Sequence, residues 1–148
     1  MDFDTLTLNR RIACPPDRLF QLLTDRRARE TWGAPGEGIV MRIDAFDMRP
    51  GGHELSVCGP VDHPEFQVRS DFHVIDAPHR LICTETLDMG EGPASISLVT
   101  HLIDADGDAS HLTVTLQIAS LIGPDMVAGY EEGWTGGLDN LTQLAEHS

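Results

Sequence analysis

The sequence predicts an α+β fold in which a row of antiparallel strands packs against a long C-terminal helix. Three observations predict it. Six strand-like runs follow one another at short, regular spacing between positions 39 and 119, with turn residues between them. A proline-led amphipathic segment, Pro15–Asp25, precedes these runs. From Pro124 onward, apolar residues recur with a helical period. Together these elements can enclose a pocket.

The N-terminal part of the chain predicts one strand and two short helices. In the strand, Thr5–Ala13, Leu6, Leu8, Arg10 and Ile12 alternate with polar residues. Pro15 and Pro16 end the strand and begin a helix, because proline is tolerated in the first helical turn. That helix has an apolar side formed by Leu19, Phe20, Leu22 and Leu23. Thr24-Asp25 begins a second short helix toward Trp32, and residues 33–38 form a loop.

The central part of the chain predicts six further strands. Their breaks are rich in Pro, Gly and Asp, as at Arg49-Pro50-Gly51-Gly52 and Asp106-Gly107-Asp108. Short, regular spacing favours hairpins and an antiparallel sheet. The expected strands are Ile39–Phe46, His53–Cys58, Glu65–Ile75, Leu81–Leu87, Ala94–Ile103 and His111–Ala119.

The last segment predicts a helix that contains several glycines. Its apolar face consists of Val127, Tyr130, Trp134, Leu138, Leu141 and Ala145. Glycine costs up to about 1 kcal/mol relative to alanine inside a helix. Either the helix begins only after Gly137, or the glycines let it lie close to the sheet or to a ligand. The second interpretation is favoured, because the apolar face runs through the glycines.

Composition and charge limit the classes of function. The 148 residues are expected to form one domain, 1–148, and no apolar run approaches the roughly 20 residues that span a bilayer. A net charge of −14 disfavours nucleic acid and anionic membranes as partners. The acidic residues are dispersed, which is typical of a soluble surface, although such a field could also steer a cationic ligand. We expect a cytoplasmic protein. Sheet edges and the Gly38–Asp47 region would allow a homodimer.

Motifs for metal, cofactor and nucleophile chemistry are missing from the sequence. The seven histidines and three cysteines show no metal-ligand spacing, so no metal is expected. No nucleophile elbow and no phosphate-binding loop occurs, and we expect no cofactor. Cys14, Cys58 and Cys83 lie in or beside strand-like runs, which favours small buried side chains in a reducing compartment.

The order of elements resembles the activator of heat-shock-protein-90 ATPase homologue family, within the START-like or SRPBCC superfamily that has the helix-grip fold of the birch pollen allergen. The resemblance covers nearly the whole chain. It implies a curved seven-stranded antiparallel sheet in the order 1-7-6-5-4-3-2, wrapped around a long C-terminal helix, with a cavity between them. The residues that carry it are Arg10–Pro15, Leu23-Thr24-Asp25, Trp32, Arg49-Pro50-Gly51-Gly52, Ala77–Leu81 with Thr84, Gly133-Trp134, Leu138 and Leu141.

Side-chain alternation selects candidate pocket residues. Arg10, His53 and Glu85 fall on faces that are otherwise apolar, where a charge needs a partner, a wet cavity or a place at the rim. They satisfy one another or reach water, or they are polar groups of a binding site. His101 is ambiguous, because both faces of its strand carry apolar residues. The family often has an aromatic residue where this chain has Glu85, which implies a more polar pocket.

Apolar side chains complete the candidate site. Phe66 and Phe72 share one strand face, and Leu138 lies on the apolar face of the last helix. Trp32 and Trp134 fit core positions better than ligand contacts on general grounds. The resemblance, however, implies that both tryptophans lie near the mouth or wall of the cavity.

The sequence is compatible with three functions. The first is a binding protein for a small, largely apolar ligand, contacted by Arg10, Trp32, His53, Phe66, Phe72, Glu85, Trp134 and Leu138. The second, an alternative known in the superfamily, is a cyclase, hydrolase or dehydratase that uses Glu85 or His53 as the acid–base group. The third is a chaperone-interaction module, as the family name suggests.

Overall fold

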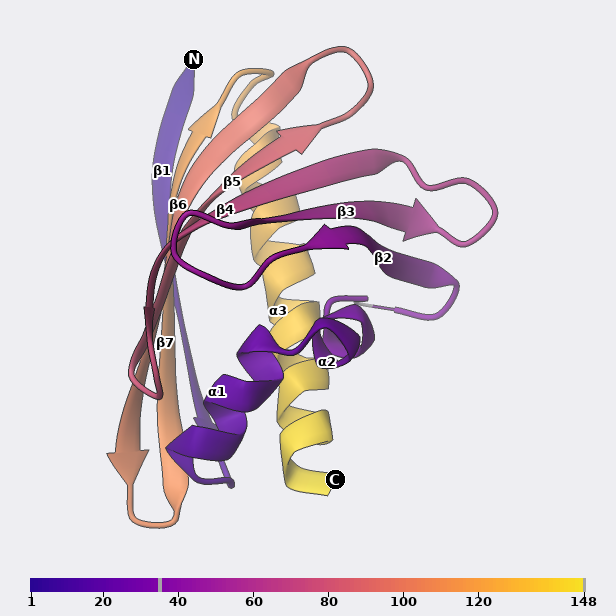
Figure 1. Cartoon of the computed structure of the whole chain (residues 1–148). Coiled ribbons are helices and arrows are strands. Elements are labelled where there is room, and N and C mark those ends of the chain that lie inside the picture. The colour runs from indigo at the N-terminus through magenta and orange to yellow at the C-terminus, as the bar shows by residue number, and fades with distance from the viewer. Residues whose placement is uncertain (35, 148) are drawn as a thin grey trace.

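The computed structural model describes residues 1–34 and 36–147 (Figure 1). Pro35, in the loop expected between the second helix and the second strand, and Ser148 lie outside the described residues. The elements in chain order are β1 (Asp2–Ile12), α1 (Pro16–Thr24), α2 (Arg26–Trp32), β2 (Ile39–Phe46), β3 (His53–Pro60), β4 (Phe66–Asp76), β5 (Arg80–Asp88), β6 (Pro93–Asp106), β7 (Ala109–Ser120) and α3 (Asp125–His147).

The seven strands form one antiparallel sheet in the order β1-β7-β6-β5-β4-β3-β2, which confirms the order implied by the resemblance. β1 returns to pair with β7, so the first and last strands are neighbours. Figure 1 shows the sheet bending around α3, with α1 and α2 beside the lower half of that helix. Within the described residues, no helix is both long and apolar enough to span a membrane.

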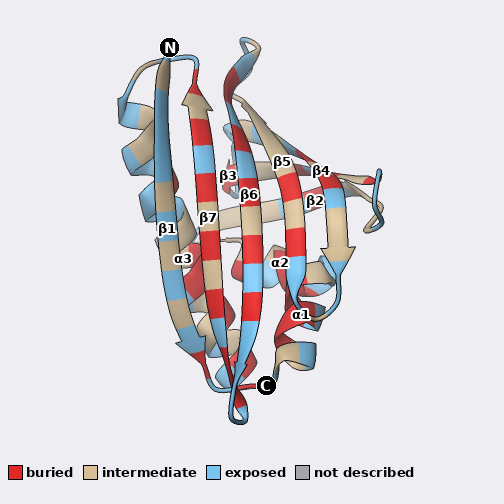
Figure 2. Ribbon diagram, turned by 90° about the vertical axis from the view of Figure 1, so that its left-hand side faces the viewer, coloured by how far each residue is buried: buried red, intermediate tan, exposed pale blue. Residues whose placement is uncertain are grey.

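The hydrophobic core lies between the concave face of the sheet and the helices. Every second residue of β7 from Leu112 to Ile118 is at most 2% exposed, as the alternation predicts. Leu138 and Leu141 of α3 and Leu19 of α1 are fully buried against it. Figure 2 shows the resulting bands of buried and exposed residues along β6 and β7. Each such leucine stabilises the fold by about 1.5–3 kcal/mol.

The short helices are positioned by a cap and by one close approach. The side chain of Asp25 accepts a hydrogen bond from the Ala28 backbone N–H (2.9 Å) and so caps α2. The end of α2 lies against β2, and a Cβ added at Gly33 would collide with the sulfur of Met41. Glycine at this position therefore permits the helix to approach the strand.

α3 runs without interruption from Asp125 to His147, which confirms that the helix passes through its glycines. The glycines serve two different contacts. At Gly137 the helix lies close to α2, since an added Cβ would be 3.6 Å from the Trp32 carbonyl oxygen. At Gly129 and Gly133 an added Cβ would meet nothing within 4 Å. Those two positions leave open space beside the helix.

Candidate functional site

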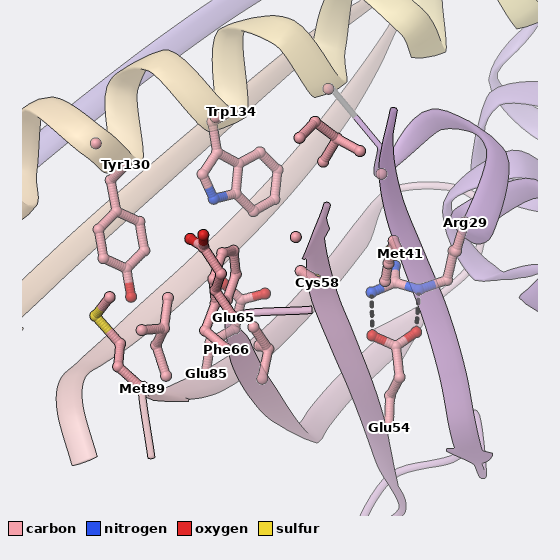
Figure 3. A pocket seen from close by; sticks show the side chains of 18 of the residues that line it. Arg29, Met41, Glu54, Cys58, Glu65, Phe66, Glu85, Met89, Tyr130 and Trp134 are labelled. Atoms are coloured by element: carbon pink, nitrogen blue, oxygen red, sulfur yellow. Dashed lines mark hydrogen bonds and ion pairs between the residues drawn. The ribbon is translucent and has the colours of Figure 1, made fainter. Parts of the chain in front are cut away.

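A cavity of about 510 Å³ lies between α3 and the inner face of the sheet. This volume is within the range of about 300–1,000 Å³ that is usual for small-molecule sites. The helix wall is formed by Met126, Gly129, Tyr130, Gly133, Trp134 and Gly137. The sheet side includes Met41, Glu54, Cys58, Phe66, Val68, Glu85 and Leu87, and other lining residues include Arg29, Trp32, Glu65 and Met89 (Figure 3).

A row of polar residues crosses the inner face of the sheet at the bottom of this cavity. Glu54 of β3 is paired in register with Ser70 of β4, Ser70 with Glu85 of β5, and Glu85 with Ser97 of β6. Directly opposite residues on adjacent strands bring their Cβ atoms to about 5 Å. Glu54, Ser70 and Ser97 are at most 1% exposed. The strands therefore place two carboxyl groups in an otherwise apolar interior.

Arg29 of α2 neutralises one of these carboxylates. Arg29 Nε and Nη2 donate to the two oxygens of Glu54 at 2.7 and 3.1 Å, and Nη1 donates to the Leu23 carbonyl at 2.7 Å. Both side chains are almost fully buried. The guanidinium carbon also lies 5.6 Å from the centroid of the Trp32 ring. The bidentate geometry makes this a well-satisfied buried ion pair.

Glu85 has no such cationic partner. Ser70 Oγ donates to Glu85 Oε2 across a long 3.5 Å. Burial raises the pKa of Glu85 to about 7, Glu54 adds to this rise, and Arg29 and the Ser70 hydroxyl oppose it. The carboxyl group consequently changes its protonation state near neutral pH. It can then donate or accept a hydrogen bond.

Tyr130 and Trp134 form the aromatic part of the helix wall. The Tyr130 hydroxyl lies 2.6 Å from Ser95 Oγ, and burial raises the pKa of the phenol. The ring of Trp134 is tilted against Trp32, with centroids 6.5 Å apart, and against His101, with centroids 5.7 Å apart. These contacts hold the indole at the cavity wall, where Figure 3 shows it facing inward.

His101, which the sequence left ambiguous, faces the interior. It is 2% exposed, and its Nδ1 lies 2.9 Å from the Leu81 carbonyl oxygen. Burial lowers the pKa of His101 to about 4, so the ring is neutral at physiological pH. Nδ1 must then carry the proton in order to donate to the carbonyl. The residue packs behind Trp134 and does not line the cavity.

The cysteines are buried or partly buried free thiols. Cys58 lines the cavity, and burial raises its pKa to about 11. Burial also raises the pKa of Cys83. Both thiols are therefore protonated at neutral pH, which is unfavourable for nucleophilic chemistry. In residues 1–34 and 36–147, no three His, Cys, Asp or Glu side chains gather as the ligands of a metal would.

Four of the residues that the sequence put forward line the cavity, namely Trp32, Phe66, Glu85 and Trp134. Phe72 and Leu138 are fully buried in the core and do not line it. Arg10 lies on β1 and reaches Asp139 of α3 at 3.4 Å, outside the cavity. Trp32, 6% exposed, has its indole N–H bonded to the Leu22 carbonyl at 2.9 Å, so it is a core residue with one edge on the cavity.

The prediction of which face of β3 turns toward the interior was wrong. His53, Leu55 and Val57 were assigned to the interior because two of them are apolar. In the structure Glu54 and Ser56 are buried at 1% and 2%, and Leu55 is 37% exposed, so His53 lies on the outer face. The physical reason is that Arg29 compensates the charge of Glu54, which lets a polar face turn inward.

Sequence reasoning also missed Arg29 and Glu54 as cavity residues. α2 reads RRARETW, in which three arginines are equivalent by pattern. Arg29 differs from the other two in its contact with Glu54 of β3, which lies 25 residues farther along the chain. One usable signal was Glu54 itself, an acidic residue inside a strand, between His53 and Leu55.

The class of protein follows from this architecture. A curved antiparallel sheet around a long C-terminal helix, with a cavity between them, is the helix-grip fold. Residues 13–146 match the family model "Activator of Hsp90 ATPase homolog 1-like protein", and the chain belongs to this family.

Solved structures of bacterial proteins have the same fold. The Mll3558 protein from Rhizobium loti is 32% identical, with 95% of this chain and 96% of that chain covered and a TM-score of 0.84. A putative uncharacterized protein from Rhizobium leguminosarum is 25% identical over 99% and 97%, with a TM-score of 0.87. CV1439 from Chromobacterium violaceum is 21% identical over 97% and 98%, with a TM-score of 0.85. No protein of curated function matches the chain.

Proposed function

We propose that this protein binds a small, largely apolar molecule in the cavity between α3 and the sheet. The observation that carries the proposal is the open space beside α3 at Gly129 and Gly133. Both glycines also lower the stability of this helix. Each glycine costs up to about 1 kcal/mol of helix stability relative to alanine. A larger side chain would be accommodated at both positions, since an added Cβ meets nothing within 4 Å.

The lining has the composition of a ligand site. Apolar and aromatic side chains such as Phe66, Val68, Leu87 and Trp134 surround a small number of polar groups. This combination is usual where burial supplies affinity and a few hydrogen bonds orient the ligand. Benzene occupies a protein cavity of about 150 Å³, so a cavity of about 510 Å³ has room for a two-ring molecule.

A cavity-filling variant tests the proposal. The neutral probe 1-naphthalenemethanol is titrated into the wild-type protein, Gly133→Leu and the matched control Ala128→Leu, and binding is followed by calorimetry. Ala128 is exposed on α3 and does not line the cavity. We expect the wild type and the control to bind alike and Gly133→Leu to lose at least tenfold in affinity while staying as stable to urea. Unchanged binding by Gly133→Leu contradicts the proposal.

Acid–base catalysis at Glu85 is a second candidate. Its support is the pKa of about 7, which suits a group that gives and takes a proton near neutral pH. His53 does not join it, because that side chain lies on the outer face of β3. Hydrolysis of 1-naphthyl acetate that is fast in the wild type and absent in Glu85→Gln would favour this candidate. Equal rates in both proteins would remove it.

The chaperone-interaction function stays a prediction from the family resemblance. An exposed apolar patch outside the cavity would be its structural requirement. On the outer face of β6, Ile96, Leu98 and Leu102 are 45%, 37% and 38% exposed. Stimulation of the ATPase activity of a purified Hsp90 by the wild type, lost in Leu98→Glu, would support this function.

A further inference from the structure

The charges that line the cavity do not balance. Among the described residues that line the cavity, Arg29 is the one cationic side chain. Three acidic residues, Glu54, Glu65 and Glu85, also line it. Glu54 is committed to Arg29 through two hydrogen bonds. The remaining nitrogen of Arg29 is committed to the Leu23 carbonyl. Three of the five N–H groups of Arg29 are therefore committed within the protein, and its charge is shared with Glu54.

Two carboxylates are left without a cation. Glu65 is exposed and lies in the loop just before β4, so it contributes negative charge at the edge of the cavity. Glu85 lies on β5, at the third position of the polar row. Figure 3 shows Arg29 turned toward Glu54. In the same view, Glu85 lies on the side of the cavity near Tyr130 and Trp134. An anionic ligand such as a fatty acid carboxylate would meet this uncompensated charge and be repelled.

Aromatic rings lie on the helix side of the same space. Tyr130 and Trp134 both line the cavity, and Phe66 lines it from β4. The faces of such rings attract cations, by about 0.5–2 kcal/mol depending on desolvation. The net charge of −14 adds a field that attracts cations toward the molecule as a whole. The unpaired carboxylates, the aromatic faces and the field of the whole molecule thus all favour a positively charged ligand.

We infer that the ligand of this cavity is an amphiphile with an apolar or aromatic body and a protonated amine, and that Glu85 is the group that pairs with the amine. The inference rests on the proposed function, which it narrows to a chemical class. The amine would donate to the Glu85 carboxylate, and the body would lie against Trp134 and Phe66. A neutral ligand lacks the ion pair, and an anionic ligand is repelled by the carboxylates and binds more weakly than either.

Binding of an amine is coupled to release of one proton. In the empty site below pH 7, Glu85 carries a proton, because its pKa is raised to about 7. The ammonium group pairs with the carboxylate form, so the carboxyl proton passes to solvent and Glu85 changes from a neutral acid to one member of an ion pair. Only the ionised fraction of Glu85 is competent to bind the amine. That fraction rises from about one tenth at pH 6 to about nine tenths at pH 8.

The thiols, the phenol and the guanidinium packed around Glu85 keep one protonation state between pH 6 and pH 8. Its neighbour on β6, Ser97, is not ionisable. The thiols and the phenol have raised pKa values and stay neutral, and Arg29 and Glu54 stay paired. A change in amine affinity between pH 6 and pH 8 is therefore assigned to Glu85. The titratable groups that share the cavity or the strand face with it are Arg29 of α2, Glu54 and Cys58 of β3, Glu65 just before β4, Cys83 of β5 and Tyr130 of α3.

Three probes of one shape test the inference: 1-naphthylmethylamine as cation, 1-naphthalenemethanol as neutral molecule and 1-naphthoic acid as anion. Dissociation constants are measured by calorimetry at pH 6 and pH 8 with the whole protein. At pH 8 we expect the amine to bind at least tenfold more tightly than the alcohol, and the acid to bind most weakly. Between pH 6 and pH 8 the affinity for the amine should rise about tenfold, and that for the alcohol should change less than threefold.

Glu85→Gln isolates the role of the carboxylate, because it keeps shape and volume and removes the charge. The control is Glu132→Gln, which removes one charge from an exposed position of α3 outside the cavity. We expect Glu85→Gln to lose the amine preference and its pH dependence, so that the amine and the alcohol bind this variant with similar affinity. The control should keep both properties.

The outcomes separate this inference from the proposed function. If none of the three probes binds, both are overturned. If the alcohol binds but the amine shows no preference at pH 8, or keeps its preference in Glu85→Gln, the cavity is a ligand site and this inference alone is overturned. Tighter binding of the naphthoate than of the amine also overturns it.

Discussion

Arg29 Nε of α2 and Glu54 Oε1 of β3 lie 2.7 Å apart, and the two side chains are 7% and 1% exposed. This contact joins the short helix to the sheet beside the cavity. It also decides which face of β3 turns inward, since Glu54 is buried only with its partner in place. The pair therefore connects the fold to the electrostatics of the site.

Removing one member of this pair should destabilise the protein strongly. Arg29→Met leaves an uncompensated buried carboxylate and Glu54→Leu leaves an uncompensated buried guanidinium, and each such loss costs about 3–5 kcal/mol. Replacing both members, with Arg29→Met and Glu54→Leu together, should cost clearly less, because no charge is left unpaired. Urea unfolding of the two single variants and the double variant measures the difference. A double variant less stable than either single variant would contradict this account of the pair.

Glu85 should make stability depend on pH. Its folded pKa of about 7 exceeds the ordinary value of 4.5, so the folded state holds the proton more tightly than the unfolded state. The resulting stabilisation is complete below about pH 4.5 and is lost as pH rises to about 7. The loss is on the order of 3 kcal/mol, at 1.36 kcal/mol per pKa unit. The difference in unfolding free energy between the wild type and Glu85→Gln, measured from pH 4.5 to pH 8, should follow this decline. A constant difference would mean that Glu85 is well solvated.

The two tryptophans should differ in their cost of truncation. Trp32 is 6% exposed and its indole N–H is hydrogen-bonded, so Trp32→Ala should cost about 3–5 kcal/mol. Trp134 is only partly buried and borders the cavity, so Trp134→Ala should cost less and should weaken probe binding more. Denaturant melts and titrations with 1-naphthalenemethanol measure both effects. The reverse ranking of stabilities would place Trp134 in the core and contradict its place on the cavity wall.

The end of α2 should not tolerate a side chain at Gly33. An added Cβ lies 2.7 Å from the Arg29 carbonyl oxygen and closer still to the Met41 sulfur, so Gly33→Ala should cost about 1–3 kcal/mol, because the backbone at the end of α2 and the Met41 side chain must both shift. Gly36→Ala is the matched control, since its nearest neighbour would be 4.0 Å away. Thermal unfolding compares them. Equal melting temperatures would show that the end of α2 and the Met41 side chain can shift without cost.

Much of the fold could be predicted from the sequence because its signals are local. Turn residues mark the hairpins, and the apolar face of α3 passes through its glycines. The inward face of β4 and the role of Glu85 as an interior polar group also follow from alternation. Strand order came from the family resemblance, since periodicity alone does not specify which strands are neighbours.

The site was harder to predict because its decisive contacts are distant in sequence. Glu54 is buried only because Arg29 meets it, and alternation by itself turns the apolar residues of β3 inward. Likewise Arg10 shares the face of β1 that meets α3, but its charge is paired with Asp139 instead of reaching the cavity. A charged residue in a strand predicts a partner, and only the tertiary structure identifies it.

The central claim is that the cavity between α3 and the sheet receives a small apolar molecule. It is tested most directly by intermolecular nuclear Overhauser effects between bound 1-naphthalenemethanol and the isotope-labelled protein. We predict contacts from the naphthalene ring to Trp134, Phe66 and Val68, and none to outer-face residues such as Leu98. Contacts confined to the outer face, with unchanged signals from Trp134, would contradict the account.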